Sequence, residues 1–485
     1  MRWRIPSINK TAISKDRGLC DAMRYKLSVK QFLEESRAGS IDYSDFAAVL
    51  MKEIERLNDK FHLFQCVADI SMKVHSKPML HGLPVSVKDN ICVQGMQSAA
   101  GSRILEGYVP TFDATCVARA KENSANIIGK TNQDEFGFGT FSTNSKYGIP
   151  KNPHDPERSC GGSSGGAAGL TAALDVPHIA LAESTGGSIS CPAAFCSVVG
   201  LTPTYGLVSR YGLIDYANSL DKIGPIGKSV YDIALMLSVI GGHDMHDSTS
   251  VQKKSEDYTK YLQKNDLKGV KIGVPKEYFI NISPDVEKSV QNAIKRLESM
   301  GATVEKVSLP NTKYALSSYY IIATAEASTN LARYCGMRYG MHLDMEGNFN
   351  EYFSKVRSKG FGDEAKRRII LGTFARMSGY RDAYYLKAMR VRTMIINDFK
   401  AAFKKVDVLA APTMPILPPK FSEIEKLTPI ENYQMDVLTV PPNLAGIPMI
   451  SLPSESGKMI GLHLMADHLQ EGKLIEVANM FEKSR

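Results

Sequence analysis

The stretch from residue 159 to residue 227 combines closely spaced glycines and serines with short apolar segments. A flexible glycine-serine linker would lack apolar segments such as those at 167–174 and 179–181. Glycine lets a backbone turn tightly, approach a ligand closely and direct its N–H groups inward. The stretch therefore predicts a folded, glycine-lined site rather than a linker.

The chain as a whole has the composition of a soluble globular protein. Its 485 residues are 43% hydrophobic and 23% charged, which excludes a disordered chain, a collagen and a simple fibre. No apolar run approaches the roughly 18 residues that a membrane-spanning helix needs. The eight cysteines are scattered and lack zinc-ligand spacing, so we expect reduced thiols and no metal site.

Positive charge is concentrated in residues 1–26. This segment holds seven basic and two acidic side chains, which leaves 52 basic against 49 acidic residues elsewhere. The near-neutral body argues against direct nucleic-acid binding, which needs cations clustered on a folded face. We interpret residues 1–26 as a disordered extension of a cytoplasmic protein. A transit peptide for the mitochondrial matrix is the alternative, although it would be poorer in acidic residues, and Met23 is a possible start.

Strand and helix patterns alternate along the chain, which predicts an α/β architecture. Residues 85–89 and 126–129 have strand patterns, and 114–123 has a helix pattern between them. A mostly helical region at about 312–405 is interpreted as a cap on one large domain spanning 27–485. Further strands are expected at 270–274, 406–411, 449–452 and 461–465, and further helices at 30–57, 229–240, 284–300 and 471–482.

Two segments place serines directly beside glycines. They are Ser159-Cys160-Gly161-Gly162-Ser163-Ser164-Gly165-Gly166 and Glu183-Ser184-Thr185-Gly186-Gly187-Ser188-Ile189-Ser190. Successive amides from Thr185 to Ser188 can point at one developing negative charge, which is the arrangement of an oxyanion hole. Each segment taken singly also fits a tight turn with solvent-facing hydroxyl groups.

One interpretation of the first segment is a hydrolase triad. Residues 161–165 match the G-x-S-x-G motif of α/β-hydrolases, and Asp436 and His463 follow in the chain order of that triad. The motif must follow a strand directly, however, and residues 152–157 with their two prolines cannot form one. The match is therefore interpreted as accidental.

A serine can also be deprotonated by a lysine, without a histidine. The amine must be neutral part of the time, or must act through a second hydroxyl group as a proton relay. Lys88 ends an apolar strand pattern and precedes Asp89-Asn90, a position that would bury its stem and direct its amine at a loop. The alternative interpretation is that Lys88 is an exposed, solvated charge, and the sequence pattern alone favours this alternative.

Several blocks of the sequence, taken in order, resemble the amidase signature family. These blocks are residues 81–90, 129–132, 161–166, 185–189, 192–196 and 200–206. Within the family, the chain is similar to the A subunits of glutamyl-tRNA(Gln)/aspartyl-tRNA(Asn) amidotransferases at residues 209–213, 219–225, 366–369 and 443–446. The resemblance runs from about residue 27 to the end. It implies a single large amidase-signature domain, with a central mixed sheet surrounded by helices and a signature core at about 81–230.

The resemblance implies a Ser–Ser–Lys triad. Ser188 would be the acylated nucleophile, Ser163 the bridging serine and Lys88 the general base that receives the proton through it. The same proton chain could donate to the leaving ammonia. The oxyanion hole would consist of the backbone amides of Thr185, Gly186, Gly187 and Ser188.

The resemblance also implies residues that bind the substrate. In the family's glutaminase subunits a Tyr, an Arg and an Asp hold the α-amino and carboxylate groups of glutamine, and they correspond to Tyr319, Arg368 and Asp436. The fork of an arginine suits a carboxylate. Because Arg368 follows Lys366 and Arg367, the alternative interpretation is that Arg368 is an exposed surface charge.

The sequence departs from the family pattern in two places. Many members carry an Asp four residues before the nucleophile and an Arg two residues after it, where this chain has Ser184 and Ser190. Losing both avoids an unpaired buried charge, which would cost ~3–5 kcal/mol, so we expect hydroxyl groups to brace the loop. The nucleophile also lies 25 residues after Ser163, one more than expected, so Ser164 is an alternative bridge.

Together these features predict the glutaminase component of a heterotrimer. The resemblance implies that the chain hydrolyses glutamine and passes the ammonia on, and that amidotransferase subunits B and C complete the complex. The complex would amidate mischarged Glu-tRNA(Gln) or Asp-tRNA(Asn) with ATP. Mischarged tRNA and ATP would bind mainly to the larger of these partners, the B protein, so this chain would bind no cofactor and no membrane. A stand-alone amidase of small amides and a scaffold that has lost activity are the alternatives; the substrate-binding residues argue against the first and the intact triad against the second.

Overall fold

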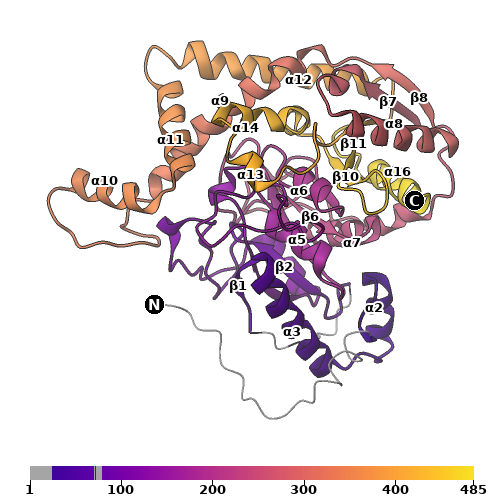
Figure 1. Ribbon diagram of the computed structural model, residues 1–485, viewed down its shortest axis with the longest axis horizontal. Helices are drawn as coiled ribbons and strands as arrows, with labels where there is room; N and C mark the ends of the chain where they lie inside the picture. Colours follow the sequence, from indigo (N-terminus) through magenta and orange to yellow (C-terminus); the bar gives the residue numbers. More distant parts are fainter. Residues whose placement is uncertain (1–23, 70–71, 73–78) are drawn as a thin grey trace.

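The computed structural model describes residues 24–69, 72 and 79–485 (Figure 1). Most of the predicted N-terminal extension, residues 1–23, lies outside the described part of the chain, so that boundary stays a prediction. Within the described residues, eleven strands form one sheet. Helices cover both of its faces, because buried clusters of apolar side chains join strands to helices on either side.

The sheet is mixed, as the resemblance implies. Its strand order is β1-β3-β2-β4-β6-β5-β10-β11-β9-β7-β8. β2 runs parallel to β3 and to β4, whereas β4 pairs with β6 and β5 pairs with β10 in antiparallel fashion. The strands are β1 Phe64–Val67, β2 Pro84–Lys88, β3 Asn126–Thr131, β4 Ile179–Ser184, β5 Val199–Thr202, β6 Lys222–Gly227, β7 Lys271–Pro275, β8 Thr303–Val307, β9 Val408–Pro412, β10 Met449–Pro453 and β11 Gly461–Ala466.

The helices begin where the sequence offers capping residues. Ser28 accepts a hydrogen bond from the amide of Gln31 in a capping box, and Asp42 caps the next helix. The helices are α2 Val29–Arg37, α3 Tyr43–Phe61, α4 Thr115–Glu122, α5 Gly165–Ala173, α6 Ser190–Phe195, α7 Val230–Ile240, α8 Pro284–Ser299, α9 Ala315–Asn330, α10 Phe349–Gly360, α11 Asp363–Arg376, α12 Lys387–Phe403, α13 Phe421–Ile424, α14 Pro429–Gln434, α15 Val440–Ala445 and α16 Glu471–Lys483.

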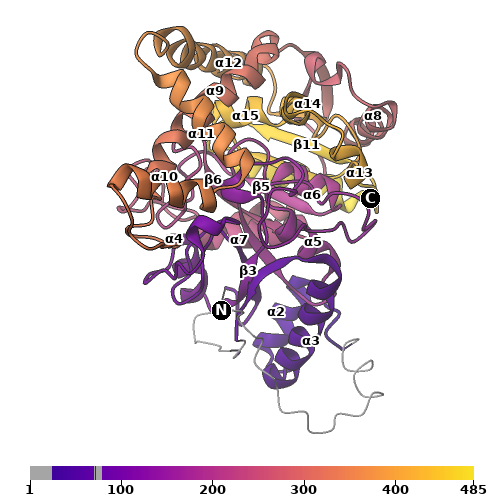
Figure 2. The same ribbon diagram turned by 60° about the vertical axis from the view of Figure 1, so that its left-hand side comes forward.

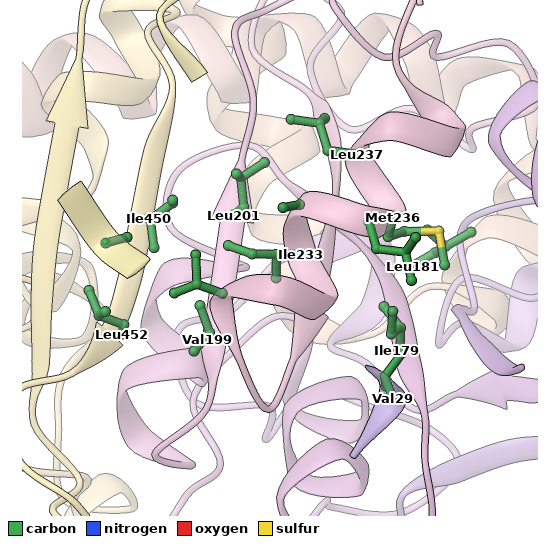
Figure 3. Packing of buried hydrophobic residues seen from close by; sticks show 14 of the residues in the cluster. Val29, Ile179, Leu181, Val199, Leu201, Ile233, Met236, Leu237, Ile450 and Leu452 are labelled. Carbon is green, nitrogen blue, oxygen red and sulfur yellow. The ribbon is translucent and has the colours of Figure 1, made fainter. Parts of the chain in front are cut away.

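Side-chain alternation along β4 separates two buried clusters. Ile179 and Leu181 belong to the largest cluster, where Leu181 lies next to Met236 of α7 (Figure 3). Ala180 and Ala182 belong to a second cluster, which contains residues of α5 and α6. Large side chains on one face and small ones on the other allow α5 and α6 to approach the sheet closely.

The close approach of α5 determines where its N-terminus lies. A Cβ atom at Gly166 would lie 2.5 Å from the carbonyl oxygens of Asn132 and Leu63, so only glycine fits there. The segment that precedes α5 is therefore held beside the chain that leaves β3. This packing brings the glycine-serine segment to the carboxyl ends of the parallel strands.

The region at 312–405 is largely helical and contains α9 to α12. Figures 1 and 2 show α9, α11 and α12 together at the end of the molecule opposite α2 and α3. Apolar residues of α9, α11 and α12 share a buried cluster with β9, β10 and β11, so the cap packs on the sheet. Within residues 24–69, 72 and 79–485, no helix combines the length and the apolar character needed to cross a membrane.

Candidate active site

Three segments meet at the carboxyl ends of β2 and β4. The two strands are parallel, so these ends lie on the same edge of the sheet. β2 ends at Lys88, Glu183 is the penultimate residue of β4, and Ser163 lies in the loop before α5. In open α/β sheets, ligands bind outside the carboxyl ends of strands, so this edge is the expected place for a site.

The Lys88 amine is enclosed by three oxygen acceptors. Its Nζ atom donates to Ser163 Oγ at 2.7 Å, to the Glu183 carbonyl oxygen at 2.9 Å and to Glu183 Oε2 at 2.9 Å. The side chain is fully buried, which excludes the solvated charge that the strand pattern alone favours. An ammonium group has three N–H donors, and the three acceptors use all of them. The contacts are therefore those of a charged amine paired with a carboxylate.

Two neighbouring serines lie close to Lys88, but they bond differently. Ser163 Oγ contacts the amine, whereas Ser164 Oγ donates to the Glu183 carbonyl oxygen at 3.1 Å. The peptide bond between Gly162 and Ser163 is cis. Of the two candidate bridging hydroxyl groups, only that of Ser163 is hydrogen-bonded to the lysine.

Glu183 connects Lys88 to a second buried carboxyl group. Its Oε2 atom accepts from Asn90 Nδ2 at 3.0 Å, and its Oε1 atom lies 2.8 Å from Thr185 Oγ1. The same threonine hydroxyl group lies 2.7 Å from Asp221 Oδ1. Burial, followed by the nearby charge of Glu183, raises the pKa of Asp221 well above its usual range.

The loop between β4 and α6 keeps its amide groups unused. Among the described residues, no N–H group at 185–188 donates to a carbonyl oxygen or to a side chain. A carbonyl group fixes the loop instead, because Asn443 Nδ2 of α15 donates to the Gly186 oxygen at 2.6 Å. Consecutive unpaired amides next to a serine can stabilise an oxyanion.

The nucleophile loop is packed so tightly that glycine is required in it. A Cβ atom at Gly186 would lie 2.6 Å from the Tyr319 hydroxyl group, and one at Gly187 would collide with the Thr439 side chain. Ser188 follows these glycines and is 6% exposed. In the described part of the chain, no hydrogen bond joins its hydroxyl group to Ser163 or to Lys88.

The hydroxyl group that braces this loop is that of Thr185, whereas Ser184 and Ser190, at the two positions that depart from the family pattern, take no part. Both serine hydroxyl groups are buried, and neither has a hydrogen-bond partner among the described residues. Other side chains hold the loop. Asn443 reaches it from α15, and Thr185 contacts Glu183 and Asp221.

Arg368 of α11 lies in a cage of aromatic rings. The residue is only 3% exposed, which excludes a surface charge. Its Nε atom donates to Glu364 Oε1 at 2.7 Å and its Nη1 atom to the Tyr216 hydroxyl group at 2.5 Å. The guanidinium group has five N–H donors, so it keeps donors for a ligand carboxylate. Its central carbon lies 5.1 to 5.6 Å from the ring centroids of Phe138, Tyr216, Tyr320 and Tyr433.

Asp436 joins the same group of side chains through Tyr320. The carboxyl group accepts from the Tyr320 hydroxyl group at 2.6 Å and from Thr140 Oγ1 at 3.0 Å. Asp436 is half-buried, and burial raises its pKa. Tyr319, the neighbour of Tyr320 on α9, packs against Gly186 of the nucleophile loop. Tyr319 thus contacts the loop directly, and Asp436 and Arg368 both contact its neighbour Tyr320.

The hydrolase-type triad is absent from this site. Both ring nitrogens of His463 are buried and have no partner among the described residues. Burial lowers the pKa of His463 to about 3, and Asp436 bonds to Tyr320 and Thr140 instead. Within the same part of the chain, no three His, Cys, Asp or Glu side chains are grouped so that they could hold a metal ion.

Several residues of the site were not predicted from the sequence. Glu183 lies in a segment that the motifs single out, but a lone carboxylate at the end of an apolar strand gives no signal of its partner. The aromatic residues around Arg368 come from four separate segments, and no spacing rule connects them. Asn443 lies in a segment that resembles the family, and that resemblance is the only signal for it.

The sequence model of the family described as Amidase matches residues 63–475. This chain belongs to the amidase family. The match confirms the family resemblance and, with the mixed sheet, the predicted fold class. Within the amidase family, the chain is similar to proteins named as the A subunit of glutamyl-tRNA(Gln) amidotransferase. It is 47% identical over 468 residues to the one from Halothermothrix orenii, covering 95% of this chain and 97% of the relative.

Two further relatives carry the same name. The chain is 52% identical over 408 residues to the protein from Methanococcoides burtonii, covering 84% of this chain and 85% of the relative. The crystal structure of the protein of that name from Thermotoga maritima superimposes with a TM-score of 0.80 at 36% identity, covering 95% of both chains. The amidase fold therefore extends over nearly the whole chain.

Proposed function

We propose that this chain is the glutaminase component of a tRNA-dependent amidotransferase. The observation that carries the proposal is the contact between the buried Lys88 amine and Ser163, at 2.7 Å, beside a loop whose amides are unpaired. A lysine, a bridging serine and free amides are what a serine amidase needs. The names of the relatives, which cover most of the chain, support the choice of reaction.

The proposed substrate is glutamine. Its α-carboxylate pairs with Arg368, whose remaining N–H donors suit a planar anion, and its α-amino group pairs with Asp436. Tyr319 contacts Gly186 of the loop that carries Ser188. An uncharged small amide would leave the remaining N–H donors of the buried Arg368 without an acceptor, and this outcome is unfavourable.

The proposed reaction has two halves. Ser188 Oγ attacks the carboxamide carbon, its proton passes to Ser163, and the Ser163 proton passes to Lys88. The amides at 185–188 stabilise the negative oxygen of the intermediate. The carbon–nitrogen bond then breaks, and the proton returns by the same path to the leaving ammonia. Water releases glutamate from Ser188 through the same groups.

The ammonia would serve a partner. In the proposed heterotrimer, subunits B and C accompany this chain, and mischarged Glu-tRNA(Gln) or Asp-tRNA(Asn) binds mainly to the B protein. ATP is consumed by the complex, and no cofactor binds to this chain. The near balance of 52 basic and 49 acidic residues outside 1–26 supports weak direct binding of tRNA.

The test is ammonia release from glutamine by the assembled complex. We expect Ser188→Ala to abolish it and Ser190→Ala, at the start of α6 and without a bonded hydroxyl group, to retain it. Undiminished release by Ser188→Ala would refute the proposal. Rapid turnover of simple amides by the isolated chain would favour a stand-alone amidase instead.

A further inference from the structure

The contacts of Lys88 raise a question about the proton path. All three donors of its amine point at oxygen acceptors, and one of them points at Ser163 itself. An ammonium group cannot accept a proton, so it must first lose one. The carboxylate oxygen of Glu183, at 2.9 Å, is an acceptor in direct contact with that amine.

The Thr185 hydroxyl group shows that the carboxyl groups behind Lys88 hold an extra proton. Its oxygen lies 2.8 Å from Glu183 Oε1 and 2.7 Å from Asp221 Oδ1. A hydroxyl group has one proton and can donate to only one of these oxygens. The other contact needs a proton from a carboxyl group, because two lone pairs would otherwise face each other. Burial and the charge of Glu183 raise the pKa of Asp221, so Asp221 is the group that keeps this proton.

We propose that Glu183 is a positioning residue that acts through Lys88, by accepting one amine proton so that the amine can take the proton of Ser163. Thr185 and Asp221 complete a buried hydrogen-bonded chain behind it. The inference rests on the proposed function, because it concerns the same lysine and the same serines. It adds a residue that the triad alone does not include.

The proton balance of the step is closed. One N–H bond of Lys88 breaks and an O–H bond forms at Glu183 Oε2, which converts the ion pair into a neutral pair. The free amine then takes the proton of Ser163, and Ser163 takes that of Ser188 as Ser188 bonds to the carboxamide carbon. On departure of ammonia, the proton returns through Ser163 and the ion pair is restored. No outside acid, base or oxidant is needed.

The low polarity of the protein interior favours this proton transfer from Lys88 to Glu183. Lys88 and Glu183 are both fully buried. Burial disfavours the two charged forms together, so the neutral pair is closer in free energy to the ion pair than it would be in water. In water the ion pair would be overwhelmingly preferred, and the lysine would be a poor acceptor.

Other charged groups face this cluster. Asp215 interacts with both Glu183 and Asp221, and burial raises its pKa. Asp134 is fully buried, feels the charges of Lys88 and Arg368, and has its pKa raised by burial to about 7. Because Asp134 titrates near neutral pH, each pH profile must also be recorded with Asp134→Asn.

The experiment follows the rate at which a fluorophosphonate probe labels Ser188 as a function of pH. This readout needs neither glutamine nor partner proteins. In the wild type, we expect the rate to be nearly constant from about pH 6 to 9, because the pair exchanges a proton internally. In Glu183→Gln, the amine must lose its proton to solvent. The acidic limb of the profile, where the labelling rate falls as the pH is lowered, therefore moves to higher pH by roughly 1 to 3 pH units.

The direction of the shift separates three roles of Glu183. If its charge merely stabilised the ammonium form, Glu183→Gln would move the acidic limb to lower pH. If Glu183 were only structural, the limb would stay in place while the folded fraction fell. Either result overturns the proposal, and Glu183→Asp, which keeps a carboxylate, should restore the wild-type limb.

A matched control comes from the neighbouring strand. Asp89 is also a buried carboxylate beside a buried lysine, Lys130, but no serine of the proposed triad contacts that pair. We expect Asp89→Asn to lower stability without moving the acidic limb. If Glu183→Gln fails to fold, the wild-type profile decides alone: a labelling rate that rises about tenfold per pH unit between pH 7 and 9 overturns the proposal. Absence of Ser188 labelling at every pH would refute the proposed function itself.

Discussion

Two buried lysines on neighbouring parallel strands have nearly the same partners. Lys88 of β2 donates to a serine hydroxyl group and to the carbonyl and carboxylate oxygens of Glu183. Lys130 of β3 donates to Ser98 Oγ at 2.6 Å and to the Asp89 carbonyl oxygen at 3.1 Å, with the Asp89 carboxylate 3.8 Å away. Burial lowers the pKa of Lys130.

The two clusters differ in what lies beyond these partners. The Asp89 carboxylate accepts hydrogen bonds from the backbone amides of Gly101 and Ala99, so it stabilises the loop at residues 99–101. The Glu183 carboxylate meets side chains instead, and its lysine contacts a serine in the segment that precedes α5. A buried lysine paired with a carboxylate is therefore no indicator of catalysis by itself. What matters is whether its hydroxyl partner lies beside a nucleophile.

The largest predicted difference between the clusters is seen when the lysines are replaced. Lys88→Met and Lys130→Met each leave a buried carboxylate without its cationic partner. Each should therefore lower the free energy of unfolding by ~3–5 kcal/mol. Only Lys88→Met should reduce ammonia release per folded molecule, by roughly 10³- to 10⁶-fold. Urea titration and the glutaminase assay check this together. Equal activity losses in the two variants would contradict the view that only the Lys88 cluster takes part in catalysis.

The hydroxyl partners allow a second paired test. Ser163→Ala removes the contact between Lys88 and the proposed nucleophile path, so we expect activity to fall by roughly 10²- to 10⁴-fold. Ser98→Ala leaves one donor of Lys130 unsatisfied, which costs ~1–3 kcal/mol of stability but should spare activity. Steady-state kinetics on both variants measures the two activity losses. Full activity of Ser163→Ala would transfer the bridging role to another group, with Ser164 as the next candidate.

A third test concerns Arg368, which lies in the aromatic cage of the proposed glutamine site. Arg368→Lys loses the planar fork, so we expect the KM for glutamine to rise by roughly 10- to 100-fold with a smaller change in kcat. Labelling of Ser188 by a fluorophosphonate should be unchanged. Arg357→Lys is the control, because Arg357 also lies in the cap but donates to backbone carbonyl groups. A KM rise shared by both variants would indicate general damage to the cap.

The last test concerns the pH dependence of stability. Burial raises the pKa of Asp134 to about 7, above its value in the unfolded chain. The folded protein therefore binds this proton more tightly, and the resulting stabilisation is complete below about pH 4 and lost as the pH rises through 7. The wild type should lose up to ~4 kcal/mol relative to Asp134→Asn across this window, as measured by urea unfolding. A difference that does not vary with pH would contradict the assignment.

The strands that were predicted from the sequence are those with a regular pattern. The alternation at 85–89 and the apolar runs at 449–452 and 461–465 correspond to β2, β10 and β11. β5 and β6 were missed because they lie within the glycine-serine stretch. β6 contains Gly224-Pro225, a pair that argues against a central strand, yet Pro225 is accommodated in the antiparallel ladder with β4.

The proposed site was only partly accessible from the sequence. The glycine-serine segments and the family resemblance name Lys88, Ser163 and Ser188. The pattern around Lys88 favours exposure, since a strand-end lysine is usually solvated, and its complete burial depends on Glu183 from another strand. The cage around Arg368 could not be predicted either, because its rings lie up to 295 positions apart, from Phe138 to Tyr433.

The strand order has a consequence for synthesis of the chain. β5 lies in the middle of the sheet, but its neighbour on one side is β10, which is translated some 250 residues later. Until residues 449–453 leave the ribosome, β5 is an open edge whose backbone groups can pair with other chains. The nascent protein thus depends on its last strands to close the sheet, and a prematurely terminated product would be prone to aggregate.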